Sequence, residues 1–305
     1  MAQALLSPEY LTMIATGFVV GTAARMSTIK EDTRQYPSYP NGKFINVITG
    51  AVAATIGAVF PITLITQNFV GVSFLMLAVQ QFRDVRKTER ESLKDLEQSE
   101  YTPRGAAYID GIAKTFESRN YLSLVASLLC VLTMMLIPGH QYVLEIPAGA
   151  LLAFLVVYLL RRYTKGKNIG DFADIKLATL SFEGSMLHVD DIPVANVGLP
   201  EAQDLLKQEG LAVMITPRTV GASIALAHYG QRQTIIHEAS RTFGLKRYLY
   251  MRRDFHNGRF CFAFVPIRRD AGSLLELVAE VPLLESTRKS ERLSNQNVLP
   301  DQGGD

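Results

Sequence analysis

The chain has 305 residues, of which 48% are hydrophobic and 20% charged, and its formal net charge is +2. The length predicts two structural units, and the small net charge excludes a general affinity for nucleic acid. Cys130 lies in an apolar run and Cys261 in a later polar region, which excludes a disulfide framework. Apolar runs dominate before Tyr163 and charges become frequent after it, so the sequence indicates a membrane part followed by a soluble part.

Apolar runs before residue 163 predict a membrane α-helical bundle. A span needs about 20 apolar residues, and the stretch 44–82 has 39 residues without Lys, Arg, Asp or Glu, enough for two spans. The turn within that stretch lies either before Pro61 or at Gln67-Asn68. The sequence therefore predicts an N-terminal segment of residues 1–9 and a five-span membrane domain of residues 10–163, with spans at 10–29, 44–82 (two), 121–137 and 142–160.

Small residues in the first two spans predict close helix packing. Gly17 and Gly21 have the spacing that lets a second helix approach closely, and Gly50, Ala54, Gly57 and Ala58 give the second span a similar face. Arg25, near the end of the first span, is expected to extend to the membrane interface.

Basic residues predict the orientation of the spans. Lys and Arg concentrate in the loop 83–120, in the loop after the first span and directly after the fifth, and they are missing from residues 138–145. Loops rich in Lys and Arg face the cytosol. The sequence therefore predicts a protein of the cell membrane with its N-terminus outside and its C-terminal domain in the cytosol.

The cytosolic loop 83–120 is predicted to be helical and to run directly into the fourth span. Thr102-Pro103 is typical of a helix start. Asp110 lies four residues before Lys114, the favourable orientation for a helical ion pair. The stretch is therefore expected to couple the membrane domain to the soluble domain.

This helix also carries a resemblance. Its residues Tyr-Ile-Asp-Gly-Ile-Ala resemble the hexapeptide that names the YIEGIA family, with aspartate in place of glutamate. The resemblance extends from the first apolar segment to about Glu285, and it implies a multi-pass membrane protein of endospore-forming bacteria with a role in sporulation. The hexapeptide is not a catalytic signature, and Gly111 is expected to mark a close helix approach. The motif residues are Tyr108, Ile109, Asp110, Gly111, Ile112 and Ala113.

Residues 168–285 are predicted to form a cytosolic α+β domain, because strand and helix patterns occur in mixed order. The polar segment 286–305 is predicted to be disordered. The predicted strands lie at 177–182, 186–197 (broken at Pro193), 211–215, 248–253 and 259–267. The predicted helices lie at 200–209, 220–243 (interrupted at Gly230) and 272–284.

Signatures of metal and nucleotide chemistry are missing from the sequence. His237-Glu238 begins like the zinc-protease motif, but Arg241 stands where the second histidine is required. There is no C-x-x-C pair and no glycine-rich phosphate loop. No metal and no cofactor are expected.

Serine-type catalysis has weak candidates in Ser223, His237 and Asp191. Catalysis by serine needs a base beside the hydroxyl and a carboxylate that orients the base. In one unbroken helix Ser223 and His237 would lie about 20 Å apart, so the two could meet only if the helix breaks at Gly230. Within the spans, Ser73 has no histidine partner at membrane depth, which disfavours an intramembrane protease.

Two functions remain open from the sequence. The first is a sporulation-associated membrane protein whose cytosolic domain binds or regulates a cytosolic protein. The second is a membrane-tethered serine-type protease acting on cytosolic proteins. A transporter is less favoured, because the spans show no repeated halves. The expected partners are the lipid bilayer and a cytosolic protein, without nucleic acid, and homo-oligomerisation stays open. Basic residues between 231 and 253, interleaved with tyrosines, suit RNA or anionic lipid headgroups, and a membrane tether favours the headgroups. An acidic protein partner fits as well.

Overall fold

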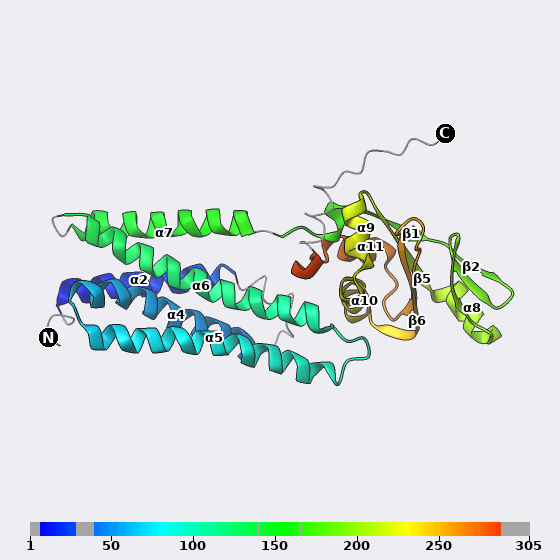
Figure 1. Ribbon diagram of the computed structural model, residues 1–305, viewed down its shortest axis with the longest axis horizontal. Helices are drawn as coiled ribbons and strands as arrows, with labels where there is room; N and C mark the ends of the chain where they lie inside the picture. Colours follow the sequence, from blue (N-terminus) through cyan, green and yellow to red (C-terminus); the bar gives the residue numbers. More distant parts are fainter. Residues whose placement is uncertain (1–6, 29–39, 139–140, 165, 288–305) are drawn as a thin grey trace. The chain divides into compact units, whose positions relative to one another are not determined.

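The computed structural model describes residues 7–28, 40–138, 141–164 and 166–287. The chain divides into two compact units, each of which is described by itself (Figure 1). The helical unit comprises Met1–Ser92 and Ile112–Lys165, and the α+β unit comprises Leu93–Gly111 and Gly166–Asp305. Nearly all of the segment predicted to be disordered, residues 288–305, lies outside the described residues.

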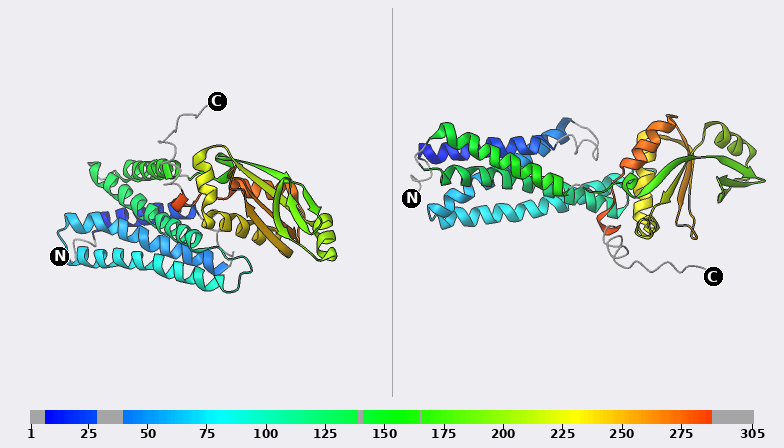
Figure 2. Two further views of the ribbon diagram at one scale, coloured as in Figure 1. Left: turned by 45° about the vertical axis from the view of Figure 1, so that its right-hand side comes forward. Right: turned by 90° about the horizontal axis from the view of Figure 1, so that it is seen from above.

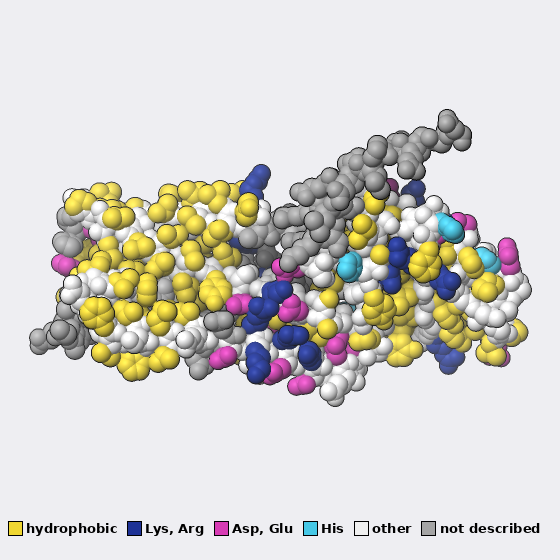
Figure 3. Space-filling view, viewed as in Figure 1, with side chains coloured by type: hydrophobic (Ala, Val, Ile, Leu, Met, Phe, Trp, Pro, Cys, Tyr) yellow, Lys and Arg dark blue, Asp and Glu magenta, His cyan; other side chains and the backbone are white. Residues whose placement is uncertain are grey.

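Within its described residues, the helical unit contains five long helices, of which three are long and apolar enough to cross a membrane. Those three stretches are Phe44–Ile65, Ala106–Leu136 and Tyr142–Tyr163 among the described residues. Apolar side chains cover most of the face of this unit that Figure 3 displays, and charged side chains gather at one end of it. The helices are α2 (Pro8–Met26), α4 (Pro40–Ile65), α5 (Phe69–Glu97), α6 (Ala106–Leu136) and α7 (Tyr142–Thr164).

The described helices therefore support three of the five predicted spans, namely those in α4, α6 and α7. Helix α2 has 19 residues, but Glu9, Arg25 and several Thr and Gly residues reduce its apolar character. Helix α5 continues from an apolar first half into a charged second half without a break. Pro61 lies inside α4, and the turn before α5 falls at the second predicted place, Gln67-Asn68, where Gln67 has a φ of 52°.

Close backbone contacts hold α2, α4 and α6 together in the helical unit. A Cβ atom built on Gly17 would lie 2.6 Å from the Val131 side chain, and one on Gly21 would lie 2.7 Å from Ala54. A Cβ atom on Gly57 would lie 2.2 Å from the backbone oxygen of Leu124. These contacts confirm the small-residue faces predicted for the first two spans.

Arg25 is fully buried in the helical unit, so the expectation that it extends to the interface is wrong. Its Nε donates to the side-chain oxygen of Asn120 at 3.1 Å, and its Nη1 donates to Thr28 Oγ1 at 2.7 Å. The guanidinium lies 5.6 Å from the centre of the Phe116 ring. Hydrogen bonds and an aromatic face compensate for the removal of this charge from water.

Two antiparallel sheets form the α+β unit, which confirms the predicted class. One sheet has the strand order β1-β5-β7-β6, and the other has the order β2-β3-β4. The strands are β1 (Ala173–Ala178), β2 (Leu180–Glu183), β3 (Met186–Val189), β4 (Ile192–Asn196), β5 (Leu211–Pro217), β6 (Leu245–Arg253) and β7 (Phe260–Pro266). The helices are η1 (Ile169–Asp171), α8 (Pro200–Glu209), α9 (Val220–Ala227), α10 (Tyr229–Phe243) and α11 (Ala271–Glu280).

Strand β7 lies at the centre of this unit and is buried on both faces. Phe260, Phe262 and Phe264 join the core that α9, α10 and α11 cover, whereas Cys261 and Ala263 pack toward the smaller sheet. Figure 2 shows the three helices on one side of the four-stranded sheet and β2–β4 with α8 on the other. The two-residue period of the strand produces this division.

Several predicted boundaries differ from the structure. The predicted strand 177–182 is two strands separated at Thr179. The predicted segment 186–197 is divided at residues 190–191 into β3 and β4, so the break expected at Pro193 is wrong, and Pro193 lies inside β4. The predicted helix 220–243 does break, but at His228 rather than Gly230. The predicted hairpin connects β6 to β7 as expected, with Gly258 at a φ of 66°.

Candidate functional site

The loop between α5 and α6 belongs to the α+β unit. Helix α6 begins at Ala106, later than the predicted start at Thr102-Pro103, because Gly105 adopts a φ of 87°. This left-handed conformation suits glycine, and the Gly105 N–H donates to Glu97 Oε1 at 2.5 Å. We call residues 97–111, which include the loop and the first four residues of the hexapeptide, the docking segment.

Tyr108 joins the docking segment to α10. The tyrosine is 5% exposed, and its hydroxyl donates to Glu238 Oε1 at 2.5 Å. Its ring meets the His237 ring edge-on, with 6.4 Å between the ring centres. The tyrosine of the hexapeptide therefore packs on the His-Glu pair whose resemblance to a zinc motif fails in the sequence.

His237 and Ser240 hold the loop part of the docking segment. The Nδ1–H of His237 donates to the Thr102 carbonyl at 2.7 Å, which fixes the proton on that nitrogen. The Thr102 and Ser240 hydroxyls share a hydrogen bond. The Nε2 of the buried His237 has no hydrogen-bond partner among the described residues. Thr102 is thus bound through both its backbone and its side chain.

Arg104 places a positive charge beside this cluster. Its side chain is 2% exposed and forms an ion pair with Glu100 at 3.2 Å. The Nε and Nη1 atoms of Arg104 have no hydrogen-bond partner among the described residues. A buried charge with incomplete pairing is costly, so Arg104 disfavours a second positive charge nearby, such as a protonated His237.

Burial determines the protonation state of the imidazole at this contact. It lowers the pKa of His237 from the ordinary value of 6.5, and Arg104 adds to this effect while the Thr102 carbonyl opposes it. At neutral pH the contact therefore contains an uncharged imidazole.

Acidification is expected to destabilise the docking segment. The pKa of His237 is lower in the folded protein than in the unfolded chain. The contribution of the neutral imidazole to stability is therefore intact above the ordinary pKa of 6.5, and it is lost as the pH falls from there toward the lowered pKa. Hydrogen exchange of residues 97–111 should therefore accelerate between about pH 7.5 and pH 5. His237→Asn, which keeps a donor near the Nδ1 position, should reduce this pH dependence. His256→Asn at an exposed position is the control, and an unchanged dependence in His237→Asn would refute the assignment.

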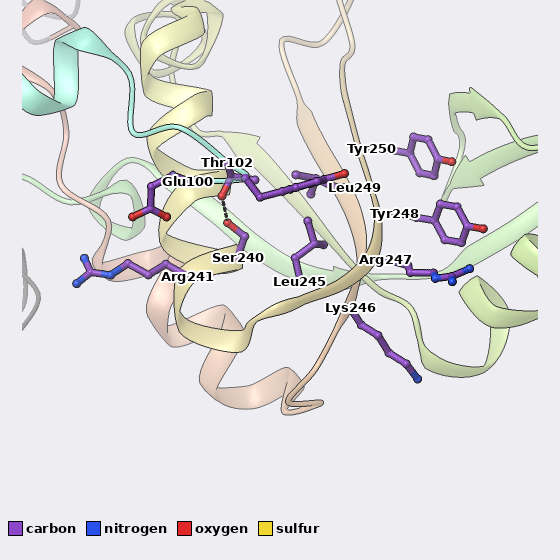
Figure 4. A pocket seen from close by; sticks show the side chains of 11 residues that line it. Glu100, Thr102, Ser240, Arg241, Leu245, Lys246, Arg247, Tyr248, Leu249 and Tyr250 are labelled. Atoms are coloured by element: carbon purple, nitrogen blue, oxygen red, sulfur yellow. Dashed lines mark hydrogen bonds between the residues drawn. The ribbon is translucent and has the colours of Figure 1, made fainter. Parts of the chain in front are cut away.

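A cleft of about 700 Å³ lies beside the docking segment. Figure 4 shows Thr102 and Ser240 on one side of strand β6 and the rings of Tyr248 and Tyr250 on the other. The cleft is thus bordered by the docking segment, by the end of α10 and by the edge strand. Its lining comprises Glu100, Tyr101, Thr102, Ser240, Arg241 and residues 245–250.

The remaining motif residues have different environments. Ile109, Ile112 and Ala113 are buried. A Cβ atom built on Gly111 would meet no other described segment within 4 Å, so the expected close approach at Gly111 is wrong. Tyr108 of the motif contacts α10 of the α+β unit through Glu238 and His237.

The three residues proposed for serine catalysis have separate surroundings. Ser223 lies against the turn at Gly258, where an added Cβ atom would lie 2.0 Å from its Oγ. Asp191 forms an ion pair with Arg259 at 2.6 Å, and His237 binds Thr102. No hydrogen bond or ion pair described in the structure joins two of the three candidates. The serine-type site therefore stays a prediction from the sequence.

Sequence reasoning missed the contact between Tyr108 and Glu238. The two residues lie 130 positions apart, and no local periodicity predicts such a pairing. Among the described residues, no group of three His, Cys, Asp or Glu side chains could hold a metal ion. The site is therefore defined by its hydrogen bonds and its neighbouring cleft.

The two units define a class of protein in which helices apolar enough to cross a membrane precede an α+β unit built on antiparallel sheets. The sequence profile described as "YIEGIA protein" matches residues 13–294, and the chain belongs to the YIEGIA family. It is 33% identical over 298 residues to a Bacillus subtilis (strain 168) protein described as "Uncharacterized protein YphB", covering 95% of this chain and 98% of that protein. No solved structure matches the chain.

Proposed function

We propose that this chain is a multi-pass protein of the cell membrane, made during sporulation, whose cytosolic α+β unit binds and regulates a cytosolic protein. The sporulation role follows from the expectation attached to the family. The distribution of Lys and Arg supports an external N-terminus and a cytosolic α+β unit.

The proposal includes α2 and the apolar first half of α5 as further spans, which gives five. Met13 and Val20 of α2 share one core with Ala58 of α4 and Val131 of α6. Because α4 and α6 are candidate spans, a helix that packs directly on both belongs at the same membrane depth. The absence of Lys, Arg, Asp and Glu from residues 69–82 supports the same assignment for α5.

The observation that carries the proposal is the hydrogen bond between Tyr108 and Glu238. Tyr108 lies in the first turn of α6, and α6 continues as one helix to Leu136. A change at α10 is therefore transmitted to the start of a candidate membrane span. Coupling of this kind requires a partner that binds two states of the contact with different affinity.

The cleft offers a place where such a partner could act. Its lining includes residues 100–102 of the docking segment as well as strand β6. A protein bound there would touch the docking segment directly. Its binding energy would then depend on whether Thr102 and Tyr108 hold their positions on α10.

The test is site-specific photocrosslinking in sporulating cells. A benzophenone side chain replaces Tyr250 in the cleft of the full-length chain, and the control replaces exposed Lys176 on β1, the opposite edge of the sheet. The proposal expects a cytosolic protein joined to position 250 only, which binds the purified full-length chain. Identical products at both positions, or none, would contradict it. Cleavage of the captured protein that requires Ser223 would favour the protease instead.

A further inference from the structure

Strand β6 is an open edge of the four-stranded sheet. It is last in the order β1-β5-β7-β6, and among the described strands it pairs only with β7. Lys246 and Tyr248 have no partner residue in β7, so the strand bulges at both positions. An edge strand presents backbone N–H and C=O groups that can pair with another chain.

The two faces of β6 differ in character. Leu245 and Leu249 pack against the core on the helix side of the sheet. Tyr248 and Tyr250 lie on the opposite side, with their rings stacked at 6.3 Å between centres. A strand added beside β6 would therefore extend an apolar surface on its helix side.

Positive charge is concentrated on β6. Its nine residues include Lys246, Arg247, Arg252 and Arg253 and no acid. Glu209 already pairs with Lys246 at 2.5 Å, whereas the exposed Arg247 borders the cleft on the face opposite the leucines. A second cleft of about 160 Å³ continues along the strand beside Arg252 and Arg253. The charge along the open edge is complementary to an acidic ligand.

We propose that an extended acidic segment of the partner protein binds β6 as an added strand. Its backbone pairs with the open edge, its apolar side chains contact Leu245 and Leu249, and its carboxylates pair with Arg247. The inference rests on the proposed function and names the mode of partner recognition. Lipid headgroups and nucleic acid would use the positive charge, but they would use neither the strand edge nor the leucines.

A peptide probe tests this mode of binding. A labelled twelve-residue peptide of alternating Glu and Val has one acidic and one apolar face when extended. Its affinity for the full-length chain in phosphatidylcholine nanodiscs is measured by fluorescence anisotropy. We expect saturable binding, and a loss of at least about tenfold when alternate backbone nitrogens are methylated on the pairing edge. The matched Lys-Val peptide should not bind.

Charge reversal tests the position of the site. Arg247→Glu should weaken binding of the Glu-Val peptide by about tenfold or more. The matched control Lys176→Glu, which makes the same type of change on exposed β1 at the other edge, should have no effect. Equal losses in the two variants would overturn the assignment to β6.

The remaining outcomes separate this inference from the proposed function. If the peptide does not bind, or binds equally after methylation, strand addition is refuted. A protein crosslinked at position 250 would still support the proposed function in that case. Binding of the full-length chain to phosphatidylglycerol vesicles or to oligouridine is measured as well. If Arg247→Glu abolishes this binding and the peptide does not bind at all, the edge is a lipid surface or an RNA surface instead. Failure to capture a protein at Tyr250 refutes the proposed function whatever the peptide does.

Discussion

Replacing Gly57 by alanine is expected to destabilise the helical unit by about 1–3 kcal/mol. The new methyl carbon would lie 2.2 Å from the backbone oxygen of Leu124 and 2.3 Å from Ser127 Oγ. Because a backbone atom cannot rotate away, α4 and α6 would have to separate. The midpoint of thermal unfolding of the full-length chain in detergent, followed by circular dichroism, should fall.

Gly111→Ala is the matched control for Gly57→Ala, because it also places a methyl group in a long helix. Among the described residues, none outside the surrounding helix backbone comes within 4 Å of the added carbon. Alanine also favours a helix over glycine by roughly 0.5–1 kcal/mol. The control should therefore be neutral or stabilising. Equal destabilisation by both variants would show that helix packing at Gly57 is looser than described.

Tyr108→Phe is expected to cost about 1.5–3 kcal/mol of docking free energy. Loss of the hydroxyl leaves the carboxylate of Glu238, which is 8% exposed, without this donor. Hydrogen exchange of residues 97–111 should accelerate more than exchange of the strand β7. In a double-mutant cycle with Glu238→Gln, the two effects should be clearly less than additive.

Tyr101→Phe is the control for Tyr108→Phe, since it removes a hydroxyl from the same segment at a residue that is 82% exposed. Surface changes of this kind usually alter stability by less than about 0.5 kcal/mol. Additive effects of Tyr108→Phe and Glu238→Gln would show that the hydrogen bond contributes nothing to docking.

Local patterns in the sequence predicted many elements of the α+β unit correctly. Pro200 at the first helical position and Gly210 after the last residue define α8 as predicted. The long helix was expected to break at Gly230, two residues after the observed break. In the structure His228 has an extended backbone, whereas Gly230 lies inside α10. The start of α6 was misplaced because Gly105 adopts a positive φ and its N–H donates to Glu97, which lies eight residues earlier in the chain.

Contacts between distant segments could not be predicted. Arg25 looked like an interfacial residue because its partner Asn120 lies 95 positions away. Tyr108 was recognised as a motif residue, but its contact with α10 depends on a hydrogen bond to Glu238. In the sequence Glu238 was noted only because His237-Glu238 begins an incomplete zinc-binding motif. The cleft likewise combines residues 100–102 with β6, and no single stretch contains both.

A disulfide between Ala107→Cys and Gly230→Cys tests the docking of the hexapeptide segment on α10 most directly. The Cβ of Ala107 lies 3.2 Å from the position that a Cβ atom on Gly230 would occupy, close to the roughly 3.5–4.5 Å typical of disulfides. Mild oxidation of the full-length chain in membranes should join the pair rapidly and in high yield. The exposed neighbour Ala106→Cys, paired with Gly230→Cys, should remain reduced. If the Ala107→Cys/Gly230→Cys pair remains reduced, or if both pairs form the disulfide to the same extent, the docked arrangement is contradicted.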